Sequence, residues 1–104
     1  MIRVVVAPEA REDLKHIWRY LANEASLGIA DRVREKVLAT FDTLALHPGI
    51  GHKRIDLTSL AVRFYSVYQY LVIYSYDSKT LRILSVIHGK RDVATLLAER
   101  FAQE

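Results

Sequence analysis

The side chains best suited to chemistry lie in the second half of this chain and are mostly basic. They are Lys53, Arg54, Arg63, Tyr65, His88, Lys90 and Arg91. Such cations hold phosphate groups, and a tyrosine or histidine beside them can stack on a base or transfer a proton, as in a ribonuclease site. The same cations can equally pair with carboxylates of a partner peptide. We expect six of them to converge on one concavity, namely Lys53, Arg54, Arg63, Tyr65, His88 and Arg91, and the sequence leaves both chemistries open.

The segment 81–92 joins a β-rich run to an abrupt basic turn. The β-branched residues of its first half favour a pleated, half-buried surface. Gly89 supplies backbone freedom that would let the chain leave the sheet sharply. We therefore expect His88, Lys90 and Arg91 at the rim of a sheet, where binding residues are commonly carried. A basic turn followed by an aspartate helix cap also fits a turn that serves solubility alone.

The charge of the chain is uneven. Residues 1–46 hold seven basic and seven acidic side chains, whereas residues 47–91 hold seven basic and only two acidic ones. This asymmetry favours an anionic partner, either a nucleic acid or an acidic protein segment. The overall net charge is only +3, which is also ordinary for the surface of a small domain.

Several classes of site are excluded. The absence of cysteine rules out disulfides and thiolate metal sites, and the four histidines lie on different expected elements, so we predict no metal site. Gly49-Ile50-Gly51 is too sparse for a phosphate-binding loop and is expected to be a turn, and no nucleophile elbow occurs. We expect no cofactor. No run is long and apolar enough to span a membrane, and no signal peptide is recognisable, so we expect a cytoplasmic protein.

The hydrophobic periodicity predicts one α+β domain over residues 1–104. The expected elements are a strand at 2–6, helices at 8–22 and 30–46, strands at 60–67, 70–76 and 81–87, and a short C-terminal helix at 93–104 capped by Asp92. The two long helices should pack as an antiparallel hairpin on an antiparallel sheet that contains three consecutive C-terminal strands. Trp18 and Phe41 fall on apolar helix stripes and are expected in the core.

Five short motifs follow one another along nearly the whole chain. They are Asp13-Leu14 with Ile17-Trp18-x-Tyr20, Leu44 with His47-Pro48-Gly49-x-Gly51, Val62-Arg63, Tyr70-x-Val72-Ile73-Tyr74, and Ile83-Leu84-x-Val86-Ile87-His88-Gly89-x-Arg91-Asp92. In this order the chain resembles the ParE branch of the RelE/ParE toxin superfamily. The resemblance implies a helical hairpin against an antiparallel sheet. It also implies the growth-arresting toxin of a type II toxin-antitoxin or plasmid stabilisation system, neutralised by an antitoxin.

The superfamily divides in function. The resemblance implies inhibition of DNA gyrase for ParE-like members and cleavage of messenger RNA on the ribosome for RelE-like members. RelE-like nucleases commonly carry a tyrosine six positions after the arginine of the Gly-Lys-Arg turn, and here that position is Leu97. This departure favours gyrase inhibition without catalytic residues. In the nuclease alternative, Arg63, His88 and Arg91 would form the site, and a third alternative is an inactive module that only binds the antitoxin.

The expected partners follow from this reading. We expect the antitoxin to present an acidic, amphipathic C-terminal segment, whose apolar side chains pack against the helical hairpin and the sheet edge. Its carboxylates are expected near Arg63, Lys90 or Arg91. DNA gyrase is the expected target, and the ribosome with its messenger RNA is the target in the alternative. No membrane partner is expected.

Overall fold

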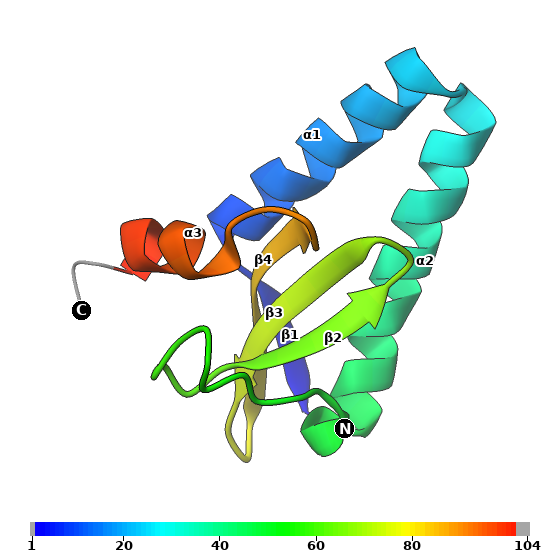
Figure 1. Ribbon diagram of the computed structural model, residues 1–104. Helices are drawn as coiled ribbons and strands as arrows, with labels where there is room; N and C mark the ends of the chain where they lie inside the picture. Colours follow the sequence, from blue (N-terminus) through cyan, green and yellow to red (C-terminus); the bar gives the residue numbers. More distant parts are fainter. Residues whose placement is uncertain (1, 102–104) are drawn as a thin grey trace.

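The computed structural model describes residues 2–101 (Figure 1). Its elements in chain order are β1 (Arg3–Val6), α1 (Pro8–Glu24), α2 (Leu27–Leu46), the 3-10 turn η1 (Pro48–Ile50), β2 (Arg63–Val67), β3 (Tyr70–Tyr76), β4 (Thr80–His88) and α3 (Val93–Phe101). The predicted α+β class and order of elements are confirmed. The end of the expected C-terminal helix, 102–104, lies outside the described residues.

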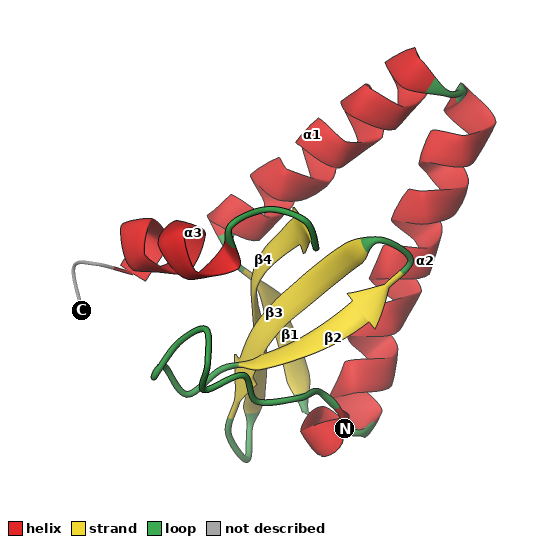
Figure 2. Ribbon diagram, viewed as in Figure 1, coloured by secondary structure: helices red, strands yellow, loops and turns green. Residues whose placement is uncertain are grey.

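The four strands form one sheet in the order β1-β4-β3-β2 (Figure 2). The three consecutive strands β2, β3 and β4 pair antiparallel, as expected. The first strand, β1, joins the other side of β4 in parallel, so the sheet is mixed. This pairing stops at Ile83, the partner of Val6. Beyond Ile83, β4 still pairs with β3, but its other edge has helix α1 beside it in place of a strand.

The helical hairpin of α1 and α2 covers one face of the sheet and projects beyond it at the tip (Figure 1). Side chains that alternate along the strands meet the apolar faces of both helices there. The buried members of this first core are Ala10, Val37, Phe41, Leu44, Val67, Tyr70, Val72, Tyr74, Leu81, Ile83 and Val86. Each large apolar side chain buried in this way stabilises the fold by about 1.5–3 kcal/mol.

Helix α3 and the segment 57–62 cover part of the opposite face of the sheet. The buried members of this second core are Val62, Phe64, Ile73, Ile87, Val93 and Leu97. Because both faces of the sheet are covered at this level, β3 is apolar almost continuously instead of alternating. A β-bulge between β3 and β4 adds Leu84 to the same core.

Two local expectations need correction, and one turn has an unusual backbone. Trp18 is half-buried outside both cores, where its indole N–H donates to Asp31 at 2.8 Å and the Arg34 guanidinium lies 5.7 Å from the ring centre. Among the described residues, the only left-handed backbone is at Tyr68 (φ 55°) in the turn between β2 and β3. The first late strand begins at Arg63, since the residues before it belong to the covering segment.

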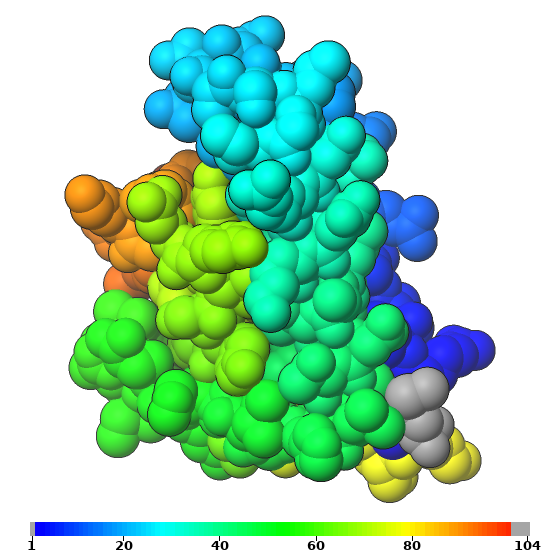
Figure 3. Space-filling model, turned by 90° about the vertical axis from the view of Figure 1, so that its right-hand side faces the viewer, coloured from blue at the N-terminus to red at the C-terminus, as the bar shows by residue number. Residues whose placement is uncertain are grey.

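The exposed surface of α2 runs the length of the molecule, with β2 packed beside it (Figure 3). Ser26 caps the start of α2: its side-chain oxygen accepts the N–H of Ile29 at 3.1 Å. None of the described helices combines the length and the apolar character needed to cross a bilayer.

Candidate functional site

The glycine-containing turn after α2 is fastened to the sheet by the hydroxyl of Tyr74. We call residues 47–51 the strap. The Tyr74 hydroxyl accepts the Gly51 N–H at 2.9 Å and donates to the Pro48 carbonyl at 2.6 Å. A β-carbon at Gly51 would lie only 2.5 Å from that hydroxyl oxygen, so this position requires glycine. Burial raises the pKa of Tyr74, against the opposing effects of the Gly51 hydrogen bond and the Arg63 charge.

Arg63 at the start of β2 completes this attachment. Its guanidinium Nη1 donates to the carbonyls of Gly49 at 3.2 Å and Gly51 at 2.8 Å, and its central carbon lies 5.8 Å from the ring centre of Tyr76. Two of its donors are therefore used within the chain. We infer that Arg63 positions the strap, a role that its motif alone did not reveal.

A shallow hollow of about 270 Å³ lies beside the strap. Its lining residues are Lys53, Ala61, Val62, Arg63, Ser75 and Tyr76. We call it the strap hollow. It brings together only two of the predicted site residues, Lys53 and Arg63. Of the others from this region, Arg54 is exposed and pairs with Asp56 at 2.8 Å, and Tyr65 packs against the first core.

The basic turn after β4 is ordered by hydrogen bonds of its own. The Lys90 N–H donates to His88 Nδ1 at 3.1 Å, and the Arg91 N–H donates to the His88 carbonyl at 3.0 Å. The Gly89 N–H donates to the Gln69 carbonyl at 2.8 Å, and a β-carbon at Gly89 would come within 3.4 Å of that oxygen. The side chains of His88, Lys90 and Arg91 therefore lie at the rim of the sheet, as predicted.

The predicted cap of the C-terminal helix is confirmed. The Asp92 carboxylate accepts the Thr95 N–H at 3.1 Å and the Thr95 hydroxyl at 2.8 Å. These hydrogen bonds from Thr95 lower the pKa of Asp92 below its ordinary value. The cap fixes where α3 begins and thus how the basic turn meets the helix.

A second hollow of about 360 Å³ lies between α1 and the end of β4. Its lining residues are Asp13, His16, Ile17, Tyr20, Leu21, Gln69, Tyr70, Val86, Ile87, His88 and Arg91. We call it the hairpin hollow. The Tyr70 and His88 rings meet edge to face with their centres 5.6 Å apart, and burial raises the pKa of Tyr70. Apolar walls and a basic rim suit an amphipathic peptide.

The two hollows lie at different ends of the sheet. Arg63 pairs with Tyr74 of β3, and His88 pairs with Tyr70, which lies four residues earlier on the same strand. At about 3.3 Å per residue, the two pairs are roughly 13 Å apart along the strand. Arg63 lines the strap hollow and Arg91 the hairpin hollow. The expectation that the basic residues converge on one concavity is therefore wrong, because the strand register separates residues that the sequence pattern grouped.

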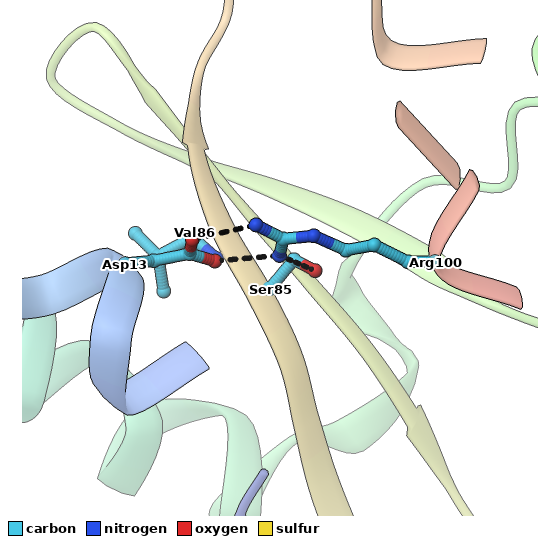
Figure 4. Close-up of polar contacts among 4 residues, drawn as sticks. All are labelled: Asp13, Ser85, Val86 and Arg100. Carbon is cyan, nitrogen blue, oxygen red and sulfur yellow. Dashed lines mark hydrogen bonds and ion pairs between the residues drawn. The ribbon is translucent and has the colours of Figure 1, made fainter. Parts of the chain in front are cut away.

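Sequence reasoning missed a polar network that joins α1, β4 and α3 (Figure 4). The Asp13 carboxylate accepts the backbone N–H of Val86 at 2.9 Å, on the part of β4 that β1 does not reach. Two Arg100 nitrogens donate to the same carboxylate at 2.8 Å each, and Arg100 Nη1 also donates to the Ser85 hydroxyl at 2.7 Å. These hydrogen bonds to Asp13 raise the pKa of Arg100. The sequence did hold one signal of this network: Asp13 is an acidic residue on the otherwise apolar face of the first helix.

No cluster of three or more metal-ligating side chains occurs within residues 2–101. The arrangement thus offers two cation-lined hollows and no constellation there that resembles a metal centre. Its chemistry is that of binding carboxylates or phosphates.

Comparison with known proteins identifies relatives of this chain. Residues 4–93 match the family model described as the ParE toxin of the type II toxin-antitoxin system, parDE. Toxin ParE3 of Caulobacter vibrioides is 24% identical over 100 residues, which cover 96% of this chain and 99% of that protein. A chain of the chromosomal ParDE toxin-antitoxin system from P. aeruginosa superposes with a TM-score of 0.72 at 15% identity, covering 85% of this chain and 96% of that one. At that identity the structural likeness concerns the fold.

Proposed function

Because this chain belongs to the ParE toxin family of type II toxin-antitoxin systems, we propose that it arrests growth by inhibiting DNA gyrase and that a cognate antitoxin neutralises it. The observation that carries the choice of target is the environment of Leu97. This residue stands where a RelE-like nuclease would have its tyrosine, and its hydrocarbon side chain is 1% exposed in the second core. A buried leucine can neither donate nor accept a proton, so it supports binding over cleavage.

The hydrogen bonds of Arg63 support the same conclusion. Two of its guanidinium donors are engaged by the strap carbonyls, and it lies in a different hollow from His88 and Arg91. A nuclease would need these groups around one phosphate, because transition-state charge is stabilised by donors already aimed at it. These observations support our proposal that the toxin acts on gyrase, and we propose the cytoplasm as the place of action.

Purified toxin should inhibit supercoiling of relaxed plasmid by gyrase or accumulate cleavage complexes, while leaving ribosome-bound messenger RNA intact. The reverse result, transcript cutting with unaffected gyrase, would replace our proposal with the RelE-like alternative. In that case Arg63→Ala and Arg91→Ala should each abolish cutting, and retained cutting in both would remove the proposed nuclease site. Absence of growth arrest on induced expression would indicate an inactive antitoxin-binding module.

We propose that the antitoxin places its acidic, amphipathic C-terminal segment in the hairpin hollow. The apolar walls there include Ile17 and Leu21, and the rim carries His88 and Arg91, with Lys90 on the adjoining turn. Apolar residues of the segment would pack on α1 while its carboxylates pair with the rim cations. The remaining predicted cations, Lys53, Arg54 and Arg63, and Tyr65 lie outside this hollow and stay candidates for contact with the target.

Antitoxin affinity offers a direct measurement of this assignment. Arg91→Glu should weaken binding at least tenfold and reduce its dependence on salt, because the attraction between Arg91 at the rim and a carboxylate of the antitoxin is replaced by repulsion. Arg19→Glu makes the same charge change on an exposed position of α1 outside the hollow and serves as the control. Equal losses in both variants would argue against the hollow. If a small DNA-binding protein is encoded next to the toxin, that protein is the antitoxin to use in this measurement.

A further inference from the structure

The sheet face that carries α3 changes character along its length. Near α3 it is apolar and buried, with Phe64, Ile73 and Leu84 in the second core. On the far side of the bulge, towards the β3–β4 turn, Arg82 on this face has Ser75 of β3 and the half-buried Val5 of β1 as its neighbours. Arg3 of β1 follows on the same face, beside Thr80 of β4. Strand alternation fixes this placement, because Val4, Tyr74, Leu81 and Ile83 point to the helical hairpin. Figure 1 shows the β3–β4 turn reaching away from α3.

Four exposed cations surround this uncovered part of the sheet, and we call it the basic face. They are Arg3, Lys53, Lys79 and Arg82. The backbone N–H of Arg3 donates to the Lys79 carbonyl at 3.0 Å, so these two residues are neighbours. Arg82 pairs with Ser75 in the ladder, and Ser75 lines the strap hollow together with Lys53. The cations therefore follow one path across the sheet from β1 to the segment beyond β2.

The positive charge of this face is only partly neutralised within residues 2–101. The ion pairs found among residues 2–101 involve other cations, namely Lys15, Arg34, Arg54 and Arg100. Asp77 in the β3–β4 turn lies among these cations: its carboxylate accepts the N–H groups of Lys79 and Thr80 at 2.8 and 2.9 Å, and the charges of Arg82 and Lys79 add to the lowering of its pKa. That carboxylate stabilises the turn, and one acid faces four cations.

We propose that the basic face binds the phosphate backbone of duplex DNA. With strands about 4.8 Å apart, the four-strand width is roughly 14 Å, over which each strand of a duplex presents about four phosphates. Apart from the half-buried Val5, the side chains that line the path are cationic or hydroxyl-bearing, which suits sequence-independent phosphate contacts. A protein partner would need buried apolar or aromatic anchors, which Arg3, Ser75, Lys79 and Arg82 do not supply. Stacking of unpaired RNA bases would need a free aromatic face, whereas the exposed ring beside this path, Tyr76, already packs against Tyr74 and Arg63.

The test is binding of a short fluorescein-labelled DNA duplex to the purified toxin, followed by fluorescence polarisation from about 50 to 200 mM salt. Four phosphate contacts predict a slope of log affinity against log salt of about −3.6, with micromolar affinity near physiological salt. The double variant Arg3→Gln/Arg82→Gln should reduce the slope to about −1.8 and weaken binding about tenfold. Both side chains are exposed, so thermal unfolding should stay unchanged.

The matched control is Arg19→Gln/Arg32→Gln, which removes the same charge from exposed positions on α1 and α2. It should bind the duplex within twofold of the parent protein. Equal weakening by the two double variants would show an effect of net charge alone and would overturn the proposal. So would salt-independent binding, or tighter binding of single-stranded RNA or of an acidic peptide than of the duplex. No gyrase is present, so the outcome is independent of the proposed target.

Discussion

Asp13 on α1 and Arg100 on α3 form a two-point ion pair across 87 positions of sequence, with both N···O distances at 2.8 Å. The same carboxylate also binds the unpaired edge of β4 through the Val86 N–H. One acidic side chain thus joins the helical hairpin, the sheet and the C-terminal helix, so its loss should weaken the packing of all three elements against one another.

Asp13→Asn should destabilise the protein by about 2–4 kcal/mol, because the half-buried Arg100 charge would lose its partner. Urea denaturation followed by circular dichroism measures the loss. Lys15→Gln, which breaks the exposed pair with Glu12, is the control and should leave stability nearly unchanged. A loss no larger than that of the control would show that the network contributes little.

Gly51→Ala should destabilise the fold by about 1–3 kcal/mol, because the added β-carbon would overlap the Tyr74 ring and displace the strap. Gly28→Ala is the matched comparison. Its β-carbon would meet nothing closer than 3.9 Å within α2, where alanine is the better helix former. We expect a slight gain in melting temperature there, and losses of similar size at both positions would contradict the strap geometry.

Leu97→Ala should cost about 2–4 kcal/mol, because it opens a cavity in the second core. Leu96→Ala removes the same atoms from a half-buried neighbour and should cost clearly less. Chemical denaturation of the two variants makes the comparison. Equal stability of both would mean that Leu97 is not the core residue on which our argument against a nuclease depends.

Low pH should reduce the stability of the folded protein partly through the protonation of Asp77 and Asp92. Backbone hydrogen bonds lower the pKa of each carboxyl below its ordinary value of 3.8 in the folded state. A lowered folded-state pKa stabilises the fold at pH values above 3.8, and that contribution is lost as the pH falls through the lowered value. The melting temperature of the parent should therefore fall more steeply than that of Asp77→Asn/Asp92→Asn as the pH is lowered from about 5 to well below 3.8.

Asparagine can still accept the same backbone hydrogen bonds, so this double variant should fold normally at neutral pH. It cannot lose a charge in acid. If both proteins show the same acid slope, the two caps do not account for the pH dependence.

The sequence by itself determined the class of the fold and the family. Helical periodicity marked both long helices, and apolar alternation with short separators marked the late strands, since these signals depend on neighbours along the chain. The bounds of β3, Tyr70–Tyr76, and the Asp92 cap agree with expectation for that reason. The five motifs in their order, the last of them ending in Arg91-Asp92, also indicated the ParE branch, which the family match confirms.

Only the tertiary structure decided which distant residues meet. The parallel pairing of β1 with β4, the strand register and the bulge at Leu84 are set by packing between remote segments, which local pattern does not encode. That register put Arg63 in the strap hollow and Arg91 in the hairpin hollow. It also left an edge of β4 for Asp13 to bind and brought Arg100 to the same carboxylate. A charge can be read from a sequence, but its partner is decided by the fold.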